Sequence, residues 1–162
     1  MSFLIKNAMN RKVVVVKPED SVKKAVKLLS AKGIGCLIVT ENDKPVGILT
    51  ERDVLNRIVI PSLSTEKTKV KQIMTKKLIS LDSEKNIADA ANLLEKNKIK
   101  KLPIIEKGKL AGIITMTDLM KSMRKIEEEQ AKKLRRVCEE LHSTKIELQT
   151  KINYLERTSK EI

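Results

Sequence analysis

The stretch GILTERD (residues 47–53) is repeated as GIITMTD (residues 112–118), and the two share the pattern Gly-Ile-x-Thr-x-x-Asp. In both, an apolar run reaches a Thr that precedes an Asp by three residues, which is typical of a strand that ends where a helix begins. Working outward at the same offset of 65 positions lays residues 5–59 onto 70–124 without a gap. An ungapped repeat of that length predicts two copies of one structural unit.

The hydrophobic pattern changes in the same order inside both copies. Short aliphatic runs predict strands, and Ser21 and Asn86 occupy equivalent N-cap positions before apolar residues at helical spacing. Polar turn residues separate the next two apolar runs, which favours hairpins. Each copy is therefore predicted to be a β-α-β-β-α unit. The predicted strands are 13–16, 37–39 and 46–49 in the first copy and 78–81, 102–105 and 110–114 in the second.

This element order, together with an entry segment that ends in Met9 or Met74, resembles the cystathionine β-synthase (CBS) domain family. The resemblance implies an α+β fold in which tandem β-α-β-β-α repeats pack sheet to sheet about a pseudo-two-fold axis. We expect the chain to divide into repeat 1 at 2–60, a linker at 61–69, repeat 2 at 70–124 and a long helix at 125–160.

In the family that the chain resembles, two clefts between the repeats commonly take AMP, ADP, ATP or S-adenosylmethionine. The ribose-binding carboxylate of that family matches Asp53 and Asp118, and its hydroxyl position matches Thr50 and Thr115. One carboxylate can accept hydrogen bonds from both vicinal hydroxyls of a ribose. The alternative is that each Thr-x-x-Asp is only a capping box. The two roles can also coexist.

The phosphates of such a ligand need cations, and the two copies differ here. Lys100 and Lys101 stand just before a predicted strand, where the resemblance implies contact with a phosphate tail, and the first copy has no basic residue at the equivalent place. We expect this pair to serve the Asp118 cleft and to make it the tighter site, while the Asp53 cleft relies on Arg52 or on lysines from elsewhere in the chain. The alternative is that both lysines are solvated surface charges.

Aliphatic side chains are the candidates for the wall that holds the adenine. Val16, Ala25 and Val39 from the first copy and Ile113 from the second are the residues we consider, and they are equally well explained as plain core.

The charge of the chain favours anionic partners. Its 162 residues include 34 Lys and Arg against 21 Asp and Glu, a formal net charge of +13. The alternative function is therefore a nucleic-acid-binding or architectural protein, including non-specific DNA or RNA binding, and the basic cluster at residues 132–136 supports it. Aromatic residues for base stacking are almost absent, at 1%, and no recognition-helix or RNA-binding signature is present. We therefore place it second.

No catalytic pattern is found in the sequence. Cys36 and Cys138 lack a paired spacing, His142 is the only histidine, and neither an HExxH nor a phosphate-binding loop motif occurs. We expect no enzyme activity, no metal site and no required cofactor beyond a regulatory nucleotide. No run of about 18 apolar residues predicts a membrane span. A cytoplasmic location is expected.

The C-terminal segment predicts a long helix, because residues 119–157 contain neither Pro nor Gly and are rich in Lys, Glu, Arg, Leu and Gln. Leucines recur there every seven residues, which favours a coiled coil. A parallel homodimer is the first expectation, docking onto another protein the second, and a solvated single helix the third. Through this helix the module would relay its ligand state. The d positions are Leu134, Leu141, Leu148 and Leu155, and the a positions are Ala131, Cys138, Lys145 and Ile152.

Overall fold

The computed structural model describes residues 4–158, with side chains described as far as residue 155. Residues 2–3 of the predicted first repeat and 159–160 of the predicted helix lie outside the described residues. The chain divides into two compact units, one that ends at Leu119 and one that begins at Met120. The first unit contains the first repeat and the second repeat as far as Leu119, and each unit is treated by itself below.

The first repeat forms a three-stranded sheet in the order β1-β2-β3, with β1 parallel to β2 and β2 antiparallel to β3. The predicted cap starts its first helix, because the Ser21 hydroxyl accepts a hydrogen bond from Lys24 N at 3.3 Å. The helix ends at Gly33, whose φ of 59° is the left-handed conformation that glycine adopts without strain. The elements are η1 (Ile5–Asn7), β1 (Val15–Val16), α1 (Val22–Lys32), β2 (Cys36–Glu41), β3 (Lys44–Thr50), α2 (Glu51–Val54) and the π-helical turn η2 (Leu55–Val59).

The second repeat has the same architecture, with strand order β4-β5-β6 and the same strand directions. Its first long helix is capped by Asn86, whose side-chain oxygen accepts from Asp89 N at 2.8 Å. The hairpin turns of both repeats carry positive φ at two successive residues, as tight two-residue hairpins require. The elements are α3 (Val70–Ile73), β4 (Leu81–Asp82), α4 (Ile87–Lys96), β5 (Lys101–Glu106), β6 (Lys109–Thr115) and α5 (Met116–Thr158).

The entry segment of each repeat crosses to the last strand of the other repeat. Thr75 forms a two-bond bridge with Ile48 of β3, at 2.8 and 3.0 Å, and Asn10 forms the equivalent bridge with Ile113 of β6, at 2.9 Å for both bonds. A Cβ on Gly47 of β3 would lie only 2.9 Å from the Met74 sulfur, so glycine is needed for this close approach. The methionine at the end of each entry segment therefore packs against the glycine of the Gly-Ile strand end in the other repeat.

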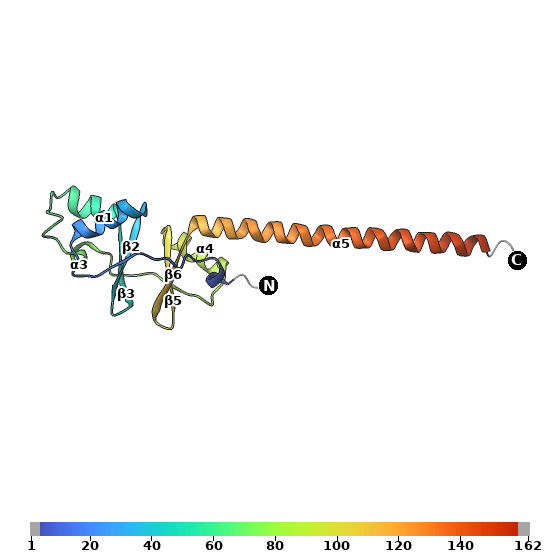
Figure 1. The fold of residues 1–162 in the computed structure, drawn as a ribbon, viewed down its shortest axis with the longest axis horizontal. Coiled ribbons are helices and arrows are strands. Elements are labelled where there is room, and N and C mark those ends of the chain that lie inside the picture. Colours follow the sequence, from blue (N-terminus) through green and yellow to red (C-terminus); the bar gives the residue numbers. More distant parts are fainter. Residues whose placement is uncertain (1–3, 159–162) are drawn as a thin grey trace. The chain divides into compact units, whose positions relative to one another are not determined.

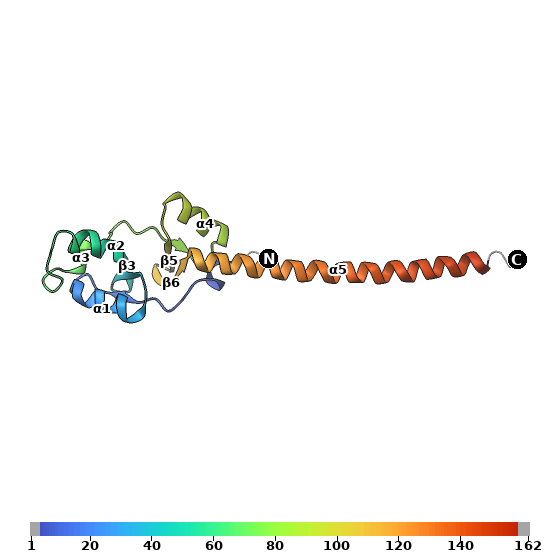
Figure 2. The ribbon, with the colours of Figure 1, turned by 90° about the horizontal axis from the view of Figure 1, so that it is seen from above.

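The two hairpins β2–β3 and β5–β6 lie side by side in the first unit (Figure 1). Seen from above, α1 and α4 lie on opposite sides of the paired hairpins, as a pseudo-two-fold axis requires (Figure 2). The predicted tandem repeat fold is therefore confirmed.

The linker at residues 61–69 packs onto the first repeat. Val22 N donates to the Thr68 carbonyl at 2.9 Å, and Val70 N donates to the Asp20 carbonyl at 2.9 Å. The first bond satisfies an N–H group at the start of α1 and the second an N–H group at the start of α3, where helices have no internal partner. The linker therefore also closes the N-terminal end of α1.

The second unit continues helix α5, which begins at Met116 and so joins the predicted last helix of the second repeat to the long helix expected from 125. The start at Met116 follows from the Thr115–Asp118 pair, which places a capping box directly after β6. The leucines at the d positions are exposed, between 55% and 69% of their surface. A single chain does not show a coiled coil, so the coiled coil stays a prediction.

Candidate functional site

A cavity of about 560 Å³ opens between the two repeats in the first unit. Its volume falls within the range of about 300–1,000 Å³ that ligand pockets commonly have. Both repeats supply its walls, and three kinds of side chain meet there: a carboxylate with hydroxyls, a group of cations, and an aliphatic surface. The lining residues are Gly35, Ile48, Thr50, Glu51, Arg52, Asp53, Thr75, Lys77, Leu78, Ile79, Lys98, Ile99, Lys100, Lys101 and Pro103.

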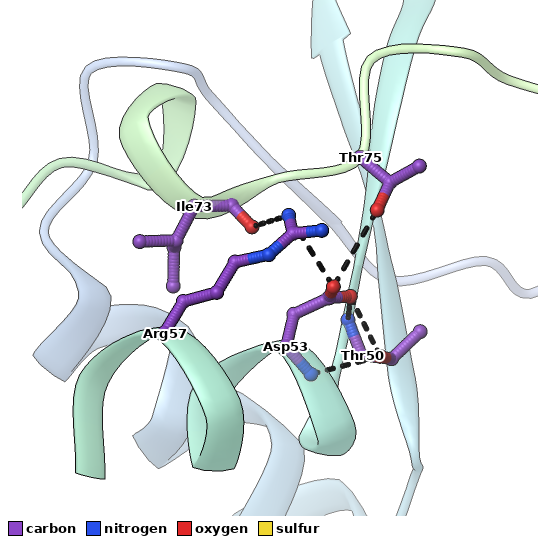
Figure 3. Close-up of polar contacts among 5 residues, drawn as sticks. All are labelled: Thr50, Asp53, Arg57, Ile73 and Thr75. Carbon is purple, nitrogen blue, oxygen red and sulfur yellow. Dashed lines mark hydrogen bonds and ion pairs between the residues drawn. The ribbon is translucent and has the colours of Figure 1, made fainter. Parts of the chain in front are cut away.

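Asp53 is fixed at the rim of this cavity by its own helix start (Figure 3). One carboxylate oxygen, Oδ2, accepts from Thr50 N at 2.9 Å and from Thr50 Oγ1 at 2.6 Å, while Asp53 N donates to Thr50 Oγ1 at 3.2 Å. These contacts form the capping box that the alternative interpretation predicted. Capping therefore uses Oδ2 and holds the carboxylate in one orientation.

The other oxygen, Oδ1, has two longer contacts. Thr75 Oγ1 and Arg57 Nη1 each lie 3.4 Å from it, near the outer limit of a hydrogen bond or ion pair. Arg57 is also engaged elsewhere, because its Nη1 donates to the Ile73 carbonyl at 2.6 Å. A carboxylate oxygen has two lone pairs, so Oδ1 retains capacity for a stronger donor such as a sugar hydroxyl.

Five cationic side chains line the cavity: Arg52, Lys77, Lys98, Lys100 and Lys101. All except Lys101 are exposed, and Lys101 is half-buried because its ammonium reaches over a glycine of the other repeat. This glycine is Gly35. A Cβ on it would lie 2.7 Å from Lys101 Nζ and 3.2 Å from Oε2 of Glu51. The ammonium is thus held at the junction of the two repeats.

The structure corrects the predicted assignment of the lysine pair. Lys100 and Lys101 lie on the cavity of Asp53, together with the predicted Thr50 and Arg52, and not with Asp118. The tighter Asp118 site therefore loses this support and stays a prediction. The prediction assumed that neighbours in one repeat share one cleft, whereas the crossed entry segments bring the strand ends of opposite repeats together.

The predicted adenine wall is also corrected. Val16, Ala25 and Val39 are buried to 3% exposure or less and belong to the hydrophobic core of the first repeat. Ile113 is bridged to the first entry segment and does not line the described cavity. The plain-core alternative therefore holds for the first three. The aliphatic wall consists instead of Ile48, Leu78, Ile79, Ile99 and Pro103.

Thr115 and Asp118 form the same capping box at the start of α5. Asp118 Oδ2 accepts from Thr115 N at 2.9 Å and from Thr115 Oγ1 at 2.6 Å. Neither residue lines the described cavity. Five predicted site residues do line that cavity: Thr50, Arg52, Asp53, Lys100 and Lys101. Thr115 and Asp118 lie apart from them.

Sequence reasoning missed Thr75, Lys77 and Lys98. Thr75 directly follows Met74 at the end of the second entry segment, and Lys77 follows two residues later. Their position is set by the bridge from Thr75 to Ile48 in the other repeat. The repeat offset gave no signal for that crossing, since it aligns equivalent residues and does not show which of them meet.

The remaining titratable side chains give no second site. Within residues 4–158, no three His, Cys, Asp or Glu side chains come together as metal ligands would. Burial raises the pKa of the Cys36 thiol, although the neighbouring Lys101 ammonium opposes the shift, so this thiol stays protonated. Over the same range, no helix combines the length and apolar character needed to cross a bilayer.

Comparison with known protein families matches the CBS domain at residues 5–60 and again at 70–125. The chain belongs to the CBS domain family. Both matches coincide with the repeats described above. The predicted family, drawn from the repeated Gly-Ile-x-Thr-x-x-Asp motif, is confirmed.

Three relatives show where such CBS pairs occur. The uncharacterized protein MK0525 of Methanopyrus kandleri is 30% identical over 121 residues, which cover 74% of this chain and 62% of that protein. Arabinose 5-phosphate isomerase KdsD of Francisella tularensis is 32% identical over 120 residues, 72% of this chain but 36% of the isomerase. This chain thus spans less than two thirds of both. The crystal structure of CBSX2 in complex with AMP matches with a TM-score of 0.68 and 28% identity, over 77% of this chain and 98% of that one.

Proposed function

We propose that this CBS pair is a regulatory module, and not an enzyme, that binds an adenine nucleotide in the cavity between its repeats. The observation that carries the proposal is that one cavity joins the fixed carboxylate of Asp53, a group of cations and an aliphatic wall. These are the three surfaces that ribose, phosphate and a purine base require. A relative of the same fold, CBSX2, was crystallised in complex with AMP, which supports adenine as the base.

Each part of the nucleotide has a defined place in this proposal. The ribose hydroxyls donate to Oδ1 of Asp53, whose present contacts at 3.4 Å are long enough to yield to them. The phosphates lie toward Lys100 and Lys101, and the base lies against Ile48 and Ile99. S-adenosylmethionine presents the same nucleoside and belongs to the set of ligands to be compared.

The lysine segment offers a route from the cavity to helix α5. Met116, the first residue of α5, donates its N–H to the Lys100 carbonyl at 3.4 Å, and Lys101 pairs with Thr115 across β5 and β6. A phosphate that draws these lysines inward therefore acts on the residues that hold the first turn of α5. We propose that α5 carries this change to a second copy of the chain or to another protein. Binding biases two states only by its difference in affinity between them.

The test uses a matched pair of variants. Asp53→Asn and Asp118→Asn remove the same charge from the same position of two equivalent capping boxes, and only Asp53 lines the cavity. Isothermal titration with AMP, ADP and ATP should show that Asp53→Asn weakens binding at least tenfold, since hydrogen bonds to a charged group contribute about 1.5–3 kcal/mol. Asp118→Asn should change the dissociation constant less than about threefold.

Two results would count against the proposal. Equal losses in both variants would show that Asp53 acts only through capping. Failure of the unmodified chain to bind any adenine nucleotide would remove the function itself.

A further inference from the structure

The charges that face the cavity are strongly unbalanced. Five cations line it against two carboxylates, Glu51 and Asp53. Asp53 also has a cation outside the lining as a neighbour, because Arg57 Nη1 lies 3.4 Å from its Oδ1, so its charge is shared with that group. Like charges that share one site repel one another and favour the arrival of a multiply charged anion.

Three of the five cations come from one short segment at the start of β5: Lys98, Lys100 and Lys101. The segment is held at both ends, because Lys98 N donates to the Glu95 carbonyl at 3.0 Å and Lys101 pairs with Thr115 of β6. Its backbone cannot carry the lysines away from one another without breaking these contacts. The backbone positions of the three lysines are therefore fixed on one rim of the cavity.

The first repeat has no such cluster. At the equivalent offset of 65 positions, its residues are Gly33, Ile34, Gly35 and Cys36. Gly35 itself lines the described cavity, where its missing side chain leaves room for the Lys101 ammonium. The lysine trio of residues 98–101 thus has no equivalent in the first repeat, and it lies on the Asp53 side.

From this asymmetry we infer that the cavity selects nucleoside di- and triphosphates over the monophosphate and over S-adenosylmethionine, and takes one such ligand per chain. The inference rests on the proposed function and names the ligand class of the same site. A phosphate monoester carries roughly two negative charges at neutral pH, and each further phosphate adds charge that the fixed lysines can meet. S-adenosylmethionine brings a sulfonium and an ammonium into a cationic cavity, which is unfavourable.

The experiment is a titration of the full chain with adenosine, AMP, ADP, ATP and S-adenosylmethionine, without magnesium, so that the phosphates alone set the charge of each nucleotide. ATP should bind at least about tenfold tighter than AMP, with a stoichiometry of one per chain. In the double variant Lys100→Gln, Lys101→Gln this advantage should fall below about threefold. The control is Lys107→Gln, Lys109→Gln, which removes the same charge from the β5–β6 turn, away from the cavity.

The outcomes separate the inference from the proposed function. If AMP or S-adenosylmethionine binds as tightly as ATP in a manner that depends on Asp53, the inference is wrong while the proposed function stands. An equal loss of the ATP advantage in the control pair would show that net charge acts in place of the lysine rim, and this too overturns the inference. If no ligand of the series binds, both are wrong.

Discussion

Substituting Gly35 by alanine tests how the two repeats share the site. An added Cβ would lie 2.7 Å from Lys101 Nζ, whereas ordinary van der Waals contact begins at 3.4 Å, so the ammonium must retreat by about 0.7 Å. With an effective dielectric constant of about 20, a charge pair contributes roughly 5.5 kcal/mol at about 3.0 Å and roughly 4.5 kcal/mol at about 3.7 Å. Gly35→Ala should therefore weaken ATP binding by about 1 kcal/mol, or about fivefold.

The folded state itself should tolerate this change. The nearest atoms are the far ends of two flexible side chains, Lys101 and Glu51, and Gly35 does not have a left-handed φ. Replacing glycine at such a position stabilises by about 0.4–1 kcal/mol, because the unfolded chain loses freedom. The melting temperature without ligand should thus stay constant or rise.

Calorimetry on a double-mutant cycle isolates the contact. In the Lys101→Gln background, Gly35→Ala should have almost no further effect on ATP binding, because the charge that it displaces is gone. Adenosine binding should be nearly unchanged throughout. Additive losses in the cycle, or an equal loss of adenosine affinity, would refute the idea that Gly35 acts by positioning the ammonium.

Three further predictions concern the rest of the chain. Leu141→Lys should reduce the mass in sedimentation equilibrium to that of a monomer, while Ser143→Lys, two residues away on the outer face of the predicted coiled coil, should not; equal masses for both would remove the coiled-coil dimer. Burial raises the pKa of the Cys36 thiol, so at high pH the folded state keeps a proton that the unfolded chain releases. The free energy of unfolding should therefore fall as the pH rises above about 9. Cys36→Ser should abolish this component. Leu37 and Leu102 are equivalent and fully buried, so denaturant unfolding should show similar losses of about 2–5 kcal/mol for alanine at either position, and a loss at only one would contradict equal repeats.

Much of the fold could be predicted because local signals agree in both copies. Ser21 and Asn86 cap their helices as expected, and the turns after β2 and β5 have positive φ, which Asn42, Asp43 and Gly108 favour and Lys107 does not. The short strands were less predictable: β1 covers only Val15–Val16 and β4 only Leu81–Asp82, although the aliphatic runs start earlier. Each of these strands lies at the edge of its sheet and pairs on one side only. The hydrogen-bonded strand is therefore shorter than the aliphatic run that contains it.

The composition of the site was predictable, but its assembly was not. Thr50, Asp53 and Arg52 lie close in sequence, so their grouping follows from one helix start. Four of the five cations come from the other repeat: Lys77 follows its entry segment, which bridges to Ile48, and Lys98, Lys100 and Lys101 lie at the start of β5. Residue types and spacing within a repeat do not carry that information, since a repeat that kept its own entry segment would have the same sequence.

The bonds at the two helix starts indicate that the proposed relay to α5 would act from one side of the cavity only. In the first repeat, Glu51 N donates to the Gly35 carbonyl at 3.4 Å, and in the second, Met116 N donates to the Lys100 carbonyl at 3.4 Å. Both carbonyls belong to residues that line the one cavity, but the first bond starts a short helix that ends within its repeat, whereas the second starts α5. In the proposed relay, a ligand that pulls on Lys100 and Lys101 would therefore act on α5 directly, and one held by Asp53 alone would not. If the helix carries the signal, ATP should change the self-association of the chain while adenosine, at equal occupancy, should not.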